Sequence, residues 1–474
     1  MHFIRTSLGI CAALIISGSV AAAEPTLTVQ ARHRLDQLLQ TSMTAGHLVG
    51  LTAQVRIDGY PSYTRSFGFA DLEQRVRSQP DDYYAIGSIT KSITAHCILL
   101  LVNEGKLQLT ARLKNVLPEY TGAGRDATIL ELLTHTSGIP DYAGDSAPDR
   151  IGDPSRRSYS QAGVLKLFSG LPADFAPGTH WQYSNSGFFL LGAILERVTG
   201  LSYDDAVHQL LFSRLGVTGI KMDYRAPIIV KRVRGYTHAA DGQIENAPSF
   251  DASIAMGAGG YGATVGALTQ YFTALFGPNI PAAVHRMATA PRTLADGNPI
   301  SYRAGALFES SLDGHQIFSH YGSIWGFHAN IAYLPRDHVT VGILTNTDDG
   351  TVNLGDLDRR ILRIVLGLSA PVVRNLPIPP VKIADYTGNY CMYERLWSKG
   401  DVSVSYSSVG HALYLIRPGE TDRSSLLLYQ GGGKFVPAED DEDVVQFVAH
   451  PSGPTRITID QSPEGTLSGV RCRR

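Results

Sequence analysis

The sequence predicts an α/β (α+β) fold: helices flank one antiparallel sheet, a helical subdomain is inserted, and a barrel-like all-β domain follows at the C-terminus. Two strand-like segments lie near the N-terminus, a long helical stretch follows, and strand-like segments return only near residue 300. Segments that are far apart in the sequence therefore complete a single sheet. Beyond a proline-rich stretch, short alternating runs separated by turns continue to the C-terminus, a pattern typical of a small barrel or sandwich.

The first hundred residues supply a helix, a hairpin and a second helix. Apolar residues between positions 27 and 45 recur at the spacing of an amphipathic helix. Residues 51–57 alternate between apolar and polar, as in a strand, and Asp58-Gly59 turns the chain toward a second strand near Tyr63–Phe67. The pattern then predicts a helix over residues 88–103.

The strands that complete the sheet come late in the sequence. They are expected at Ile300–Glu309, Gln316–His320, Asn330–Leu334 and Thr340–Thr345, and a helix near 356–368 closes the unit. We expect this last helix and the first one to cover the same face of the sheet.

A proline-rich segment is predicted to divide the chain into two domains. Residues 369–380 contain four prolines and are predicted to form a stiff linker between a unit at 24–368 and a β-domain at 381–474. The β-domain strands are expected at Val402–Tyr406, Leu413–Ile416, Leu426–Tyr429, Val444–Val448 and Ile457–Ile459. The acidic run Glu439–Asp443 is expected to be a solvated turn between two of them.

The first 23 residues have the layout of a secretory signal peptide. A short basic segment at Met1–Arg5 precedes the apolar run Leu8–Ile16, and Ala21-Ala22-Ala23 supplies a cleavage site. The run is too short to span ~30 Å of hydrocarbon, and no later stretch reaches ~18 apolar residues. We therefore expect an exported protein, periplasmic or secreted, with no stable membrane span once the signal is removed.

Composition excludes several classes of partner. The 474-residue chain has a net charge of -2 and no long Lys/Arg run, which disfavours nucleic acid as a partner. No Cys/His cluster has zinc spacing, so no metal is expected. Gly257-x-Gly259-x-x-Gly262 lacks the preceding strand and following acidic residue of a dinucleotide site, so no cofactor is expected either. In an oxidising compartment, Cys391 and Cys472 can pair and leave Cys97 buried and free.

Ser88 and Lys91 are the candidate nucleophile and base. Residues three apart on a helix share one face, so the serine oxygen and the lysine amine can meet. A serine hydroxyl needs an adjacent base to act as a nucleophile, and a lysine can be that base only if its pKa is lowered. Ser-x-x-Lys alone is weak evidence, because a helix-capping serine followed by a solvated lysine is common.

Two further polar clusters strengthen the hypothesis. Tyr183, which can relay a proton, and Asn185, which can hold a substrate carbonyl, follow a Pro-Gly turn. His320-Tyr321-Gly322-Ser323 stands where an apolar strand ends, and the N–H of Ser323 can form half of an oxyanion hole with that of Ser88. A core aromatic and a buried structural histidine are the alternative interpretations of Tyr183 and His320.

The ordered set Ser88-x-x-Lys91, Tyr183-x-Asn185 and His320-x-Gly322 resembles that of the penicillin-binding proteins and class C β-lactamases. The flanking segments 129–141 and 177–192 also resemble this family. The resemblance implies a β-lactamase/transpeptidase-like serine hydrolase domain over residues 24–368, with the active site between a sheet unit and a helical subdomain. Residues 381–474 resemble the lipocalin-like domain appended to some relatives.

The third motif departs from the β-lactamase pattern. Members that hydrolyse β-lactams usually carry Lys-Thr-Gly where His320-Tyr321-Gly322 stands here, and a histidine at this position resembles some D-Ala-D-Ala carboxypeptidases, D-aminopeptidases and esterases. The resemblance thus implies an acyl-enzyme at Ser88, with Lys91 and Tyr183 catalytic and with Asn185, His320, Gly322 and Ser323 binding substrate. Expected substrates are D-peptides or small esters. A class C-like β-lactamase and a non-catalytic penicillin-recognising sensor are the alternatives, and the oligomeric state stays open.

Overall fold

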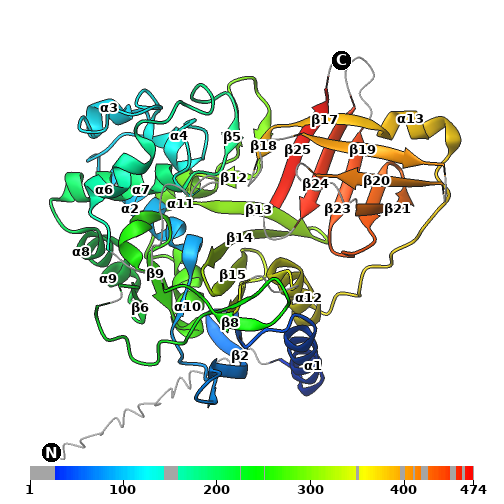
Figure 1. Ribbon diagram of the computed structural model, residues 1–474, viewed down its shortest axis with the longest axis horizontal. Helices are drawn as coiled ribbons and strands as arrows, with labels where there is room; N and C mark the ends of the chain where they lie inside the picture. The colour runs from blue at the N-terminus through cyan, green and yellow to red at the C-terminus, as the bar shows by residue number, and fades with distance from the viewer. Residues whose placement is uncertain are drawn as a thin grey trace, which may run out of the picture.

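The protein consists of a mixed α-helical and β-sheet unit followed by a β-barrel (Figure 1). The computed structural model describes residues 27–143, 158–224, 226–249, 251–348, 352–395, 401–408, 411–417, 425–448, 455–461 and 465–472. The predicted signal peptide, residues 1–23, lies outside the described residues.

The central sheet joins strands from the two ends of the mixed unit, as the sequence predicts. Its eight strands are antiparallel and run in the order β12-β13-β14-β15-β16-β1-β2-β3. β1 pairs with β16 in a register that places Leu51 opposite Thr345. The strands are β1 (Gly50–Ile57), β2 (Tyr60–Asp71), β3 (Val76–Arg77), β12 (Tyr302–Arg303), β13 (Leu307–Leu312), β14 (His315–Ile324), β15 (Phe327–Leu334) and β16 (Val339–Thr345).

The two faces of the sheet bury different helices. The first and last helices of the unit, α1 (Val29–Ala45) and α12 (Leu354–Leu366), lie side by side and cover one face, as predicted (Figure 1). Their apolar stripes, which include Leu35, Leu39 and Leu357, form one core with the strands. The other face packs against α10 (Val265–Leu275) and a larger core that extends into the helical region.

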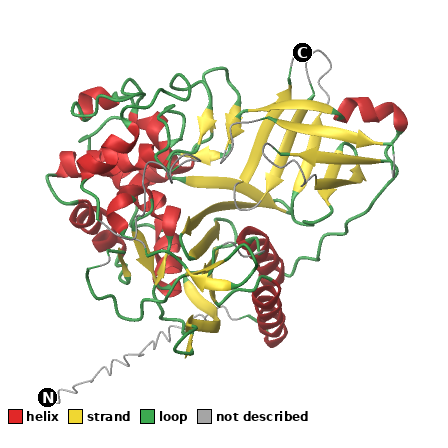
Figure 2. Ribbon diagram, in the orientation of Figure 1, coloured by secondary structure: helices red, strands yellow, loops and turns green. Residues whose placement is uncertain are grey.

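Figure 2 shows the helices of the mixed unit gathered beside the strands. The central helix of this region, α2 (Thr90–Asn103), is buried from Thr90 to Leu101. A helix that is buried on all sides packs against neighbours all round. The described residues of this region also form η1 (Gly87–Ile89), α3 (Leu113–Val116), α4 (Ile129–Leu133), α6 (Gln161–Phe168), α7 (Asn185–Thr199), α8 (Tyr203–Val207), η3 (His208–Phe212), α9 (Ser213–Leu215), η4 (Ala252–Ile254), η5 (Met256–Ala258) and α11 (Ala282–Thr289).

Short strands in the loops of this region pair in small sheets of two or three strands. They are β4 (Tyr84–Ala85), β5 (Trp181–Gln182), β6 (Ile220–Met222), β7 (Tyr236–His238), β8 (Ile244–Asn246), β9 (Tyr261–Ala263), β10 (Arg292–Thr293) and β11 (Pro299–Ile300). The predicted strand at 300–309 is in fact two strands, β12 and β13, because the chain turns between them at Ala306, which has a φ of 54°.

The C-terminal part is a closed eight-stranded barrel whose consecutive strands pair antiparallel, the up-and-down arrangement of lipocalins. A 3₁₀ turn, η6 (Pro380–Lys382), and the helix α13 (Ile383–Tyr386) lead into it. Its strands are β17 (Gly388–Met392), β19 (Val402–Ser407), β20 (Ala412–Ile416), β21 (Ser425–Gly431), β22 (Lys434–Pro437), β23 (Val444–Val448), β24 (Arg456–Gln461) and β25 (Gly465–Arg471). A separate short strand, β18 (Glu394–Arg395), leaves the barrel after β17.

A disulfide bond joins Cys391 to Cys472, at the seam where β17 pairs with β25. The structure thus forms the pairing that the sequence left open, and Cys97 is buried and free. The sequence pattern missed three barrel strands: β17, β22 and β25. Their inward residues, such as Tyr390 and Phe435, become a recognisable apolar set only once the barrel closes around them.

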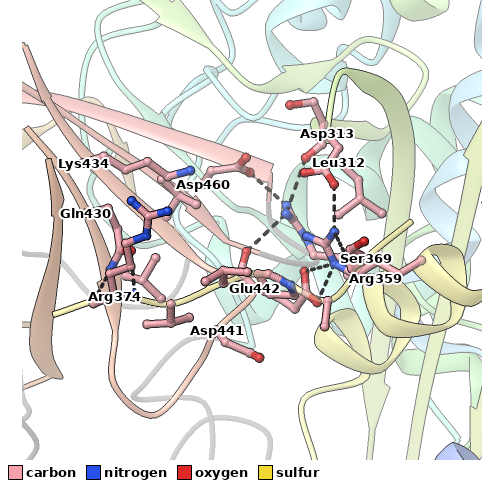
Figure 3. Close-up of a pocket in the computed structure, with 18 of the residues that line it drawn as sticks. Leu312, Asp313, Arg359, Ser369, Arg374, Gln430, Lys434, Asp441, Glu442 and Asp460 are labelled. Atoms are coloured by element: carbon pink, nitrogen blue, oxygen red, sulfur yellow. Dashed lines mark hydrogen bonds and ion pairs between the residues drawn. The ribbon is translucent and has the colours of Figure 1, made fainter. Parts of the chain in front are cut away.

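Ion pairs join the barrel to α12, and they correct one prediction. The acidic turn after β22 was expected to be solvated, but Glu442 and Asp443 are buried, at 3% and 6% exposure. Glu442 accepts hydrogen bonds from the Arg363 guanidinium at 2.9 and 3.1 Å, and Arg359 pairs with Asp460 of β24 at 3.0 Å (Figure 3). A carboxylate can be buried this deeply because arginine neutralises it. A cavity of about 720 Å³ lies between the barrel and the mixed unit beside these ion pairs.

Among the described residues, none of the helices is both long and apolar enough to cross a bilayer.

We expect the Cys391–Cys472 disulfide to stabilise the barrel, because it joins the first and last strands across 81 residues of sequence. Replacing both cysteines with serine should lower the free energy of unfolding of the barrel by about 2–5 kcal/mol. Urea unfolding followed by the aromatic signal would measure this. Reductant should lower the urea midpoint of the parent protein to that of the double variant and leave the midpoint of the double variant unchanged. A parent midpoint that does not shift with reductant would contradict the prediction.

Candidate active site

Ser88 and Lys91 meet at the start of the central helix. Ser88 lies in η1 and Lys91 in the first turn of α2, and Lys91 Nζ is 3.0 Å from Ser88 Oγ. The preceding Gly87 has a φ of 48°, a conformation that favours glycine. The chain therefore bends sharply into the helix and holds the serine one turn before the lysine.

The Lys91 amine is completely buried, and three oxygen atoms surround it. Besides Ser88 Oγ, it contacts Asn185 Oδ1 at 2.8 Å and the carbonyl oxygen of Ala258 at 2.6 Å. Burial penalises the charged form and lowers the pKa of Lys91 to about 7, although the Asp141 carboxylate acts in the opposite direction. A substantial fraction of Lys91 is therefore neutral at neutral pH.

The neighbours of Lys91 decide where its lone pair points. A neutral amine has two N–H bonds and one lone pair, and the carbonyl of Ala258 and Oδ1 of Asn185 can only accept hydrogen bonds. These two acceptors take both N–H groups. The lone pair is left facing Ser88 Oγ, the orientation that a base needs in order to remove the serine proton.

Asp141 fixes the orientation of the Asn185 amide. Asn185 is the first residue of α7; its backbone N–H donates to Asp141 Oδ1 at 3.1 Å and its Nδ2 donates to Asp141 Oδ2 at 3.0 Å. Because Nδ2 faces the carboxylate, Oδ1 must face Lys91. Burial raises the pKa of Asp141, while hydrogen bonds from Ala143 and Asn185 and the charge of Lys91 oppose the rise.

Tyr183 stands directly after β5, with its side chain against the same pair. Lys91 Nζ lies 4.7 Å from the centre of the Tyr183 ring. Burial raises the pKa of Tyr183 well above its usual value, although its hydrogen bond with the Ser88 side chain lowers it. The phenol is therefore protonated at neutral pH, and it can donate to the serine oxygen whose own proton faces Lys91.

His135 holds the Tyr183 segment in place. Its carbonyl accepts the N–H of Gln182 at 3.0 Å, its Nδ1 accepts the N–H of Ser184 at 3.1 Å, and its ring centre is 4.4 Å from that of Tyr183. His135 has a φ of 58°, which is costly for a residue other than glycine. Its hydrogen bonds to Gln182 and Ser184, the residues on either side of Tyr183, hold the Tyr183 segment in position.

Backbone N–H groups of Ser88 and Ser323 lie close together where β14 passes η1. A Cβ built on Gly322 would lie 3.0 Å from the backbone nitrogen of Ser88, and one built on Gly87 would lie 3.0 Å from that of Ser323. The same Cβ on Gly322 would lie 1.9 Å from the carbonyl oxygen of Ile86, so only glycine fits there. The close approach brings together the two donors predicted for an oxyanion hole.

His320 is fully buried and neutral. Its Nδ1 lies 2.6 Å from the carbonyl oxygen of Tyr321, which can only accept, so Nδ1 carries the proton and Nε2 accepts from the Tyr302 hydroxyl at 3.2 Å. Burial, with the nearby charge of Lys91, lowers the pKa of His320 to about 3. Both ring nitrogens are thus hydrogen bonded within the protein.

The structure brings Ser88, Lys91, Tyr183 and Asn185 together and places Gly322 and Ser323 beside them. The sequence interpretation gave no role to His135, Asp141 or the Ala258 carbonyl. The polar run Thr134–Ser137 between apolar residues, followed by Asp141, was the available signal. Two groups of potential metal ligands occur among the described residues, Cys391/Asp401/Cys472 and Asp356/Asp440/Asp443, and neither includes a residue of this site.

A family model described as Beta-lactamase matches residues 35–366. The chain belongs to this family. It is a family of serine hydrolases that act through an acyl-enzyme. The predicted β-lactamase/transpeptidase-like fold is thereby confirmed.

Curated relatives of the β-lactamase family include both penicillin-binding and esterase members. A penicillin-binding protein of Bacillus subtilis (strain 168) is 28% identical over 304 residues, which cover 61% of this chain and 66% of that protein. Esterase EstB of Burkholderia gladioli is 35% identical over 195 residues, which cover 39% of this chain and 50% of the esterase. The chain thus spans between 35% and 66% of the length of the first curated relatives it matches.

Solved structures extend the similarity to the barrel. The octameric penicillin-binding protein homologue from Pyrococcus abyssi matches with a TM-score of 0.63 and 21% identity over 92% of this chain and 99% of that chain. A D-stereospecific amidohydrolase from Streptomyces sp. matches with a TM-score of 0.62 and 25% identity, over 71% of this chain and 99% of that chain. The first of these shows similarity of fold alone.

We expect Asp141→Asn to shift the titration of Lys91 to lower pH. The Asp141 carboxylate raises the pKa of Lys91, so its neutralisation should move that pKa below about 7. A lysine base works in its deprotonated form, so the acid limb of the pH profile should move in the same direction. The rate at which a fluorophosphonate labels the protein would report this without knowledge of the substrate.

Asp174→Asn is the matched control for this measurement. Asp174 accepts a hydrogen bond from the Gln182 side chain at 3.0 Å, beside the same segment, but is not among the charges that act on Lys91. Its removal should leave the acid limb in place. An acid limb that stays fixed, or moves to higher pH, in Asp141→Asn would contradict the assignment of Lys91 as the base.

Proposed function

We propose that the protein is an exported serine hydrolase that forms an acyl-enzyme at Ser88 and acts on small esters or D-amino-acid amides and peptides. The observation that carries this proposal is the buried Lys91 amine, 3.0 Å from Ser88 Oγ, with a pKa lowered to about 7. A serine in this setting has a base of matched pKa within reach, and both N–H groups of that base have fixed acceptors.

In the proposed mechanism, neutral Lys91 removes the proton of Ser88 as the serine oxygen attacks the substrate carbonyl. The N–H groups of Ser88 and Ser323 stabilise the oxyanion. Tyr183, which is protonated and hydrogen bonded to Ser88, then gives its proton to the leaving group and recovers one from Lys91. Water attacks the acyl-enzyme by the reverse route, and Asn185 and Asp141 keep the amine oriented throughout.

The third motif disfavours β-lactams as substrates. β-Lactams carry a carboxylate, and members of the family that hydrolyse them usually have a lysine where His320 stands. Here His320 is neutral because burial lowers its pKa to about 3, and its ring nitrogens already bond to Tyr302 and to the Tyr321 carbonyl. The part of β14 beside Ser88 therefore offers no positive charge for a carboxylate. Esters and amides do not need one.

The names of relatives agree with this choice without deciding it. One curated relative is an esterase, and one similar structure is a D-stereospecific amidohydrolase. Export is proposed from the N-terminal pattern alone. The lipocalin-like barrel is included in the proposal as part of the enzyme, from residue 381 onward.

We expect Ser88→Ala to abolish catalysis. Loss of the nucleophile should lower kcat by at least about 10⁴-fold and eliminate covalent labelling by a fluorophosphonate. Ser213→Ala is the control: it removes an exposed serine on α9 and should take up one fluorophosphonate label per chain, as the parent protein does. Labelling that persists in Ser88→Ala would show that another residue is the nucleophile, and a parent protein that takes up no label would favour the non-catalytic sensor.

We expect kcat/KM for a p-nitrophenyl ester or a D-amino-acid amide to exceed that for nitrocefin by at least about a hundredfold, or about 2.7 kcal/mol of transition-state preference. The physical reason is the neutral His320 in place of a cation. Steady-state assays on the same purified protein would measure all three values. Nitrocefin turnover equal to that of the ester would instead support the class C-like β-lactamase.

A further inference from the structure

The strand that carries the Tyr183 segment is held along both edges, and one edge belongs to the C-terminal barrel. On the first edge, the N–H of Gln182 donates to the carbonyl of His135 at 3.0 Å. On the second edge, β5 pairs in parallel with β18, with Trp181 opposite Glu394 and Gln182 opposite Arg395. The N–H of Trp181 donates to the carbonyl of Tyr393 at 3.3 Å. Figure 1 shows β5 and β18 side by side.

The barrel in turn holds β18. The N–H of Tyr393 donates to the carbonyl of Ser468 in β25 at 2.9 Å, so the backbone of Tyr393 bonds to the barrel on one side and to β5 on the other. Two residues earlier, Cys391 is joined to Cys472 by the disulfide at the barrel seam. The barrel is itself fixed to the mixed unit through the ion pairs of α12. β18 is therefore anchored at a defined place relative to β5.

β5 needs this support because it is only two residues long. Pairs of isolated short strands are marginally stable, so the position of β5 depends on its neighbours. The Trp181 side chain is fully buried and packs against Tyr302 and Phe308, but Tyr183 must also be placed accurately at Ser88. A displacement of about 1 Å of a catalytic group can cost about a hundredfold in rate.

We propose that two backbone groups in the barrel domain, the Tyr393 carbonyl and the Arg395 amide, position Tyr183 for catalysis. They are positioning groups, since they act through β5 and not on the substrate. The inference rests on the proposed function of Tyr183 as the proton relay. It makes the barrel a structural part of the active site, in contrast to an appended binding module that could be removed without loss of hydrolysis.

The register offers a matched pair of variants. In this parallel ladder, Trp181 lies opposite Glu394 and hydrogen bonds to the two neighbours of Glu394, which are Tyr393 and Arg395. The backbone amide of Arg395 therefore faces β5, whereas that of Glu394 faces away. Proline removes an N–H group while keeping an extended backbone. Arg395→Pro should therefore break the pairing, whereas Glu394→Pro should retain it, and Arg395→Ala controls for loss of the side chain.

With p-nitrophenyl acetate as the probe, Arg395→Pro should lower kcat by about 30- to 100-fold and leave KM within about twofold, because Tyr183 is misplaced while the substrate pocket is intact. Glu394→Pro and Arg395→Ala should retain the parent kcat. Equal losses in both proline variants, or none in Arg395→Pro, would overturn the proposal. If Arg395→Pro does not fold, removal of the disulfide by Cys391→Ser with Cys472→Ser should lower kcat in the folded protein, and an unchanged kcat would overturn the proposal.

A double-variant cycle separates this proposal from the proposed function. If the barrel acts through Tyr183, Arg395→Pro should cost little more in a Tyr183→Phe background than Tyr183→Phe costs alone. Additive losses would overturn the positioning proposal. If Tyr183→Phe lowers kcat and Arg395→Pro does not, only the positioning proposal fails. If Tyr183→Phe leaves kcat unchanged, the relay fails and the positioning proposal fails with it.

Discussion

The burial of one amine is the constraint on which the rest of this structure depends. A lysine at zero exposure, with a pKa near 7, has lost several kcal/mol of hydration relative to a solvated lysine, and the surrounding fold must offset that cost. The offset comes from three oxygen atoms contributed by η1, α7 and η5, which are far apart in the sequence. The central helix can hold Lys91 in this state only because the helical region closes completely around it.

The electrostatics of the site follow from that burial. Within the described residues around Ser88, His135 and His320 are neutral and Tyr183 is protonated, because burial disfavours each of their charged forms. Lys91 and Asp141 form the only pair there that shares a buried charge, bridged by the Asn185 amide. In the proposed mechanism, a site with so little fixed charge activates Ser88 through the position of the shared proton. The same proposal favours an uncharged ester or amide over a β-lactam, which carries a carboxylate.

The candidate active site is assembled from parts that could not hold their geometry alone. The proposed oxyanion donors depend on a close approach of β14 to η1 that only glycine permits. Tyr183 directly follows a two-residue strand, β5, which is supported by His135, with its strained backbone, and by β18 of the barrel. The barrel can give that support because buried ion pairs join it to α12 and a disulfide closes its seam. Backbone contacts of β5 and side-chain contacts of the barrel thus link the docking of the two parts to the geometry of the site.

The sequence by itself determined the fold class, the distant origin of the sheet strands and the candidate motifs around Ser88, Tyr183 and His320. These properties depend on local periodicity and on short spacings, which are visible in a linear chain. Only the tertiary structure decided that Asp141 orients Asn185, that Ala258 and Asn185 turn the Lys91 lone pair toward Ser88, and that Glu442 is buried against Arg363. Each of these depends on contacts between residues about 40 to 170 positions apart, and burial, which sets every pKa in the site, does not exist until those residues meet.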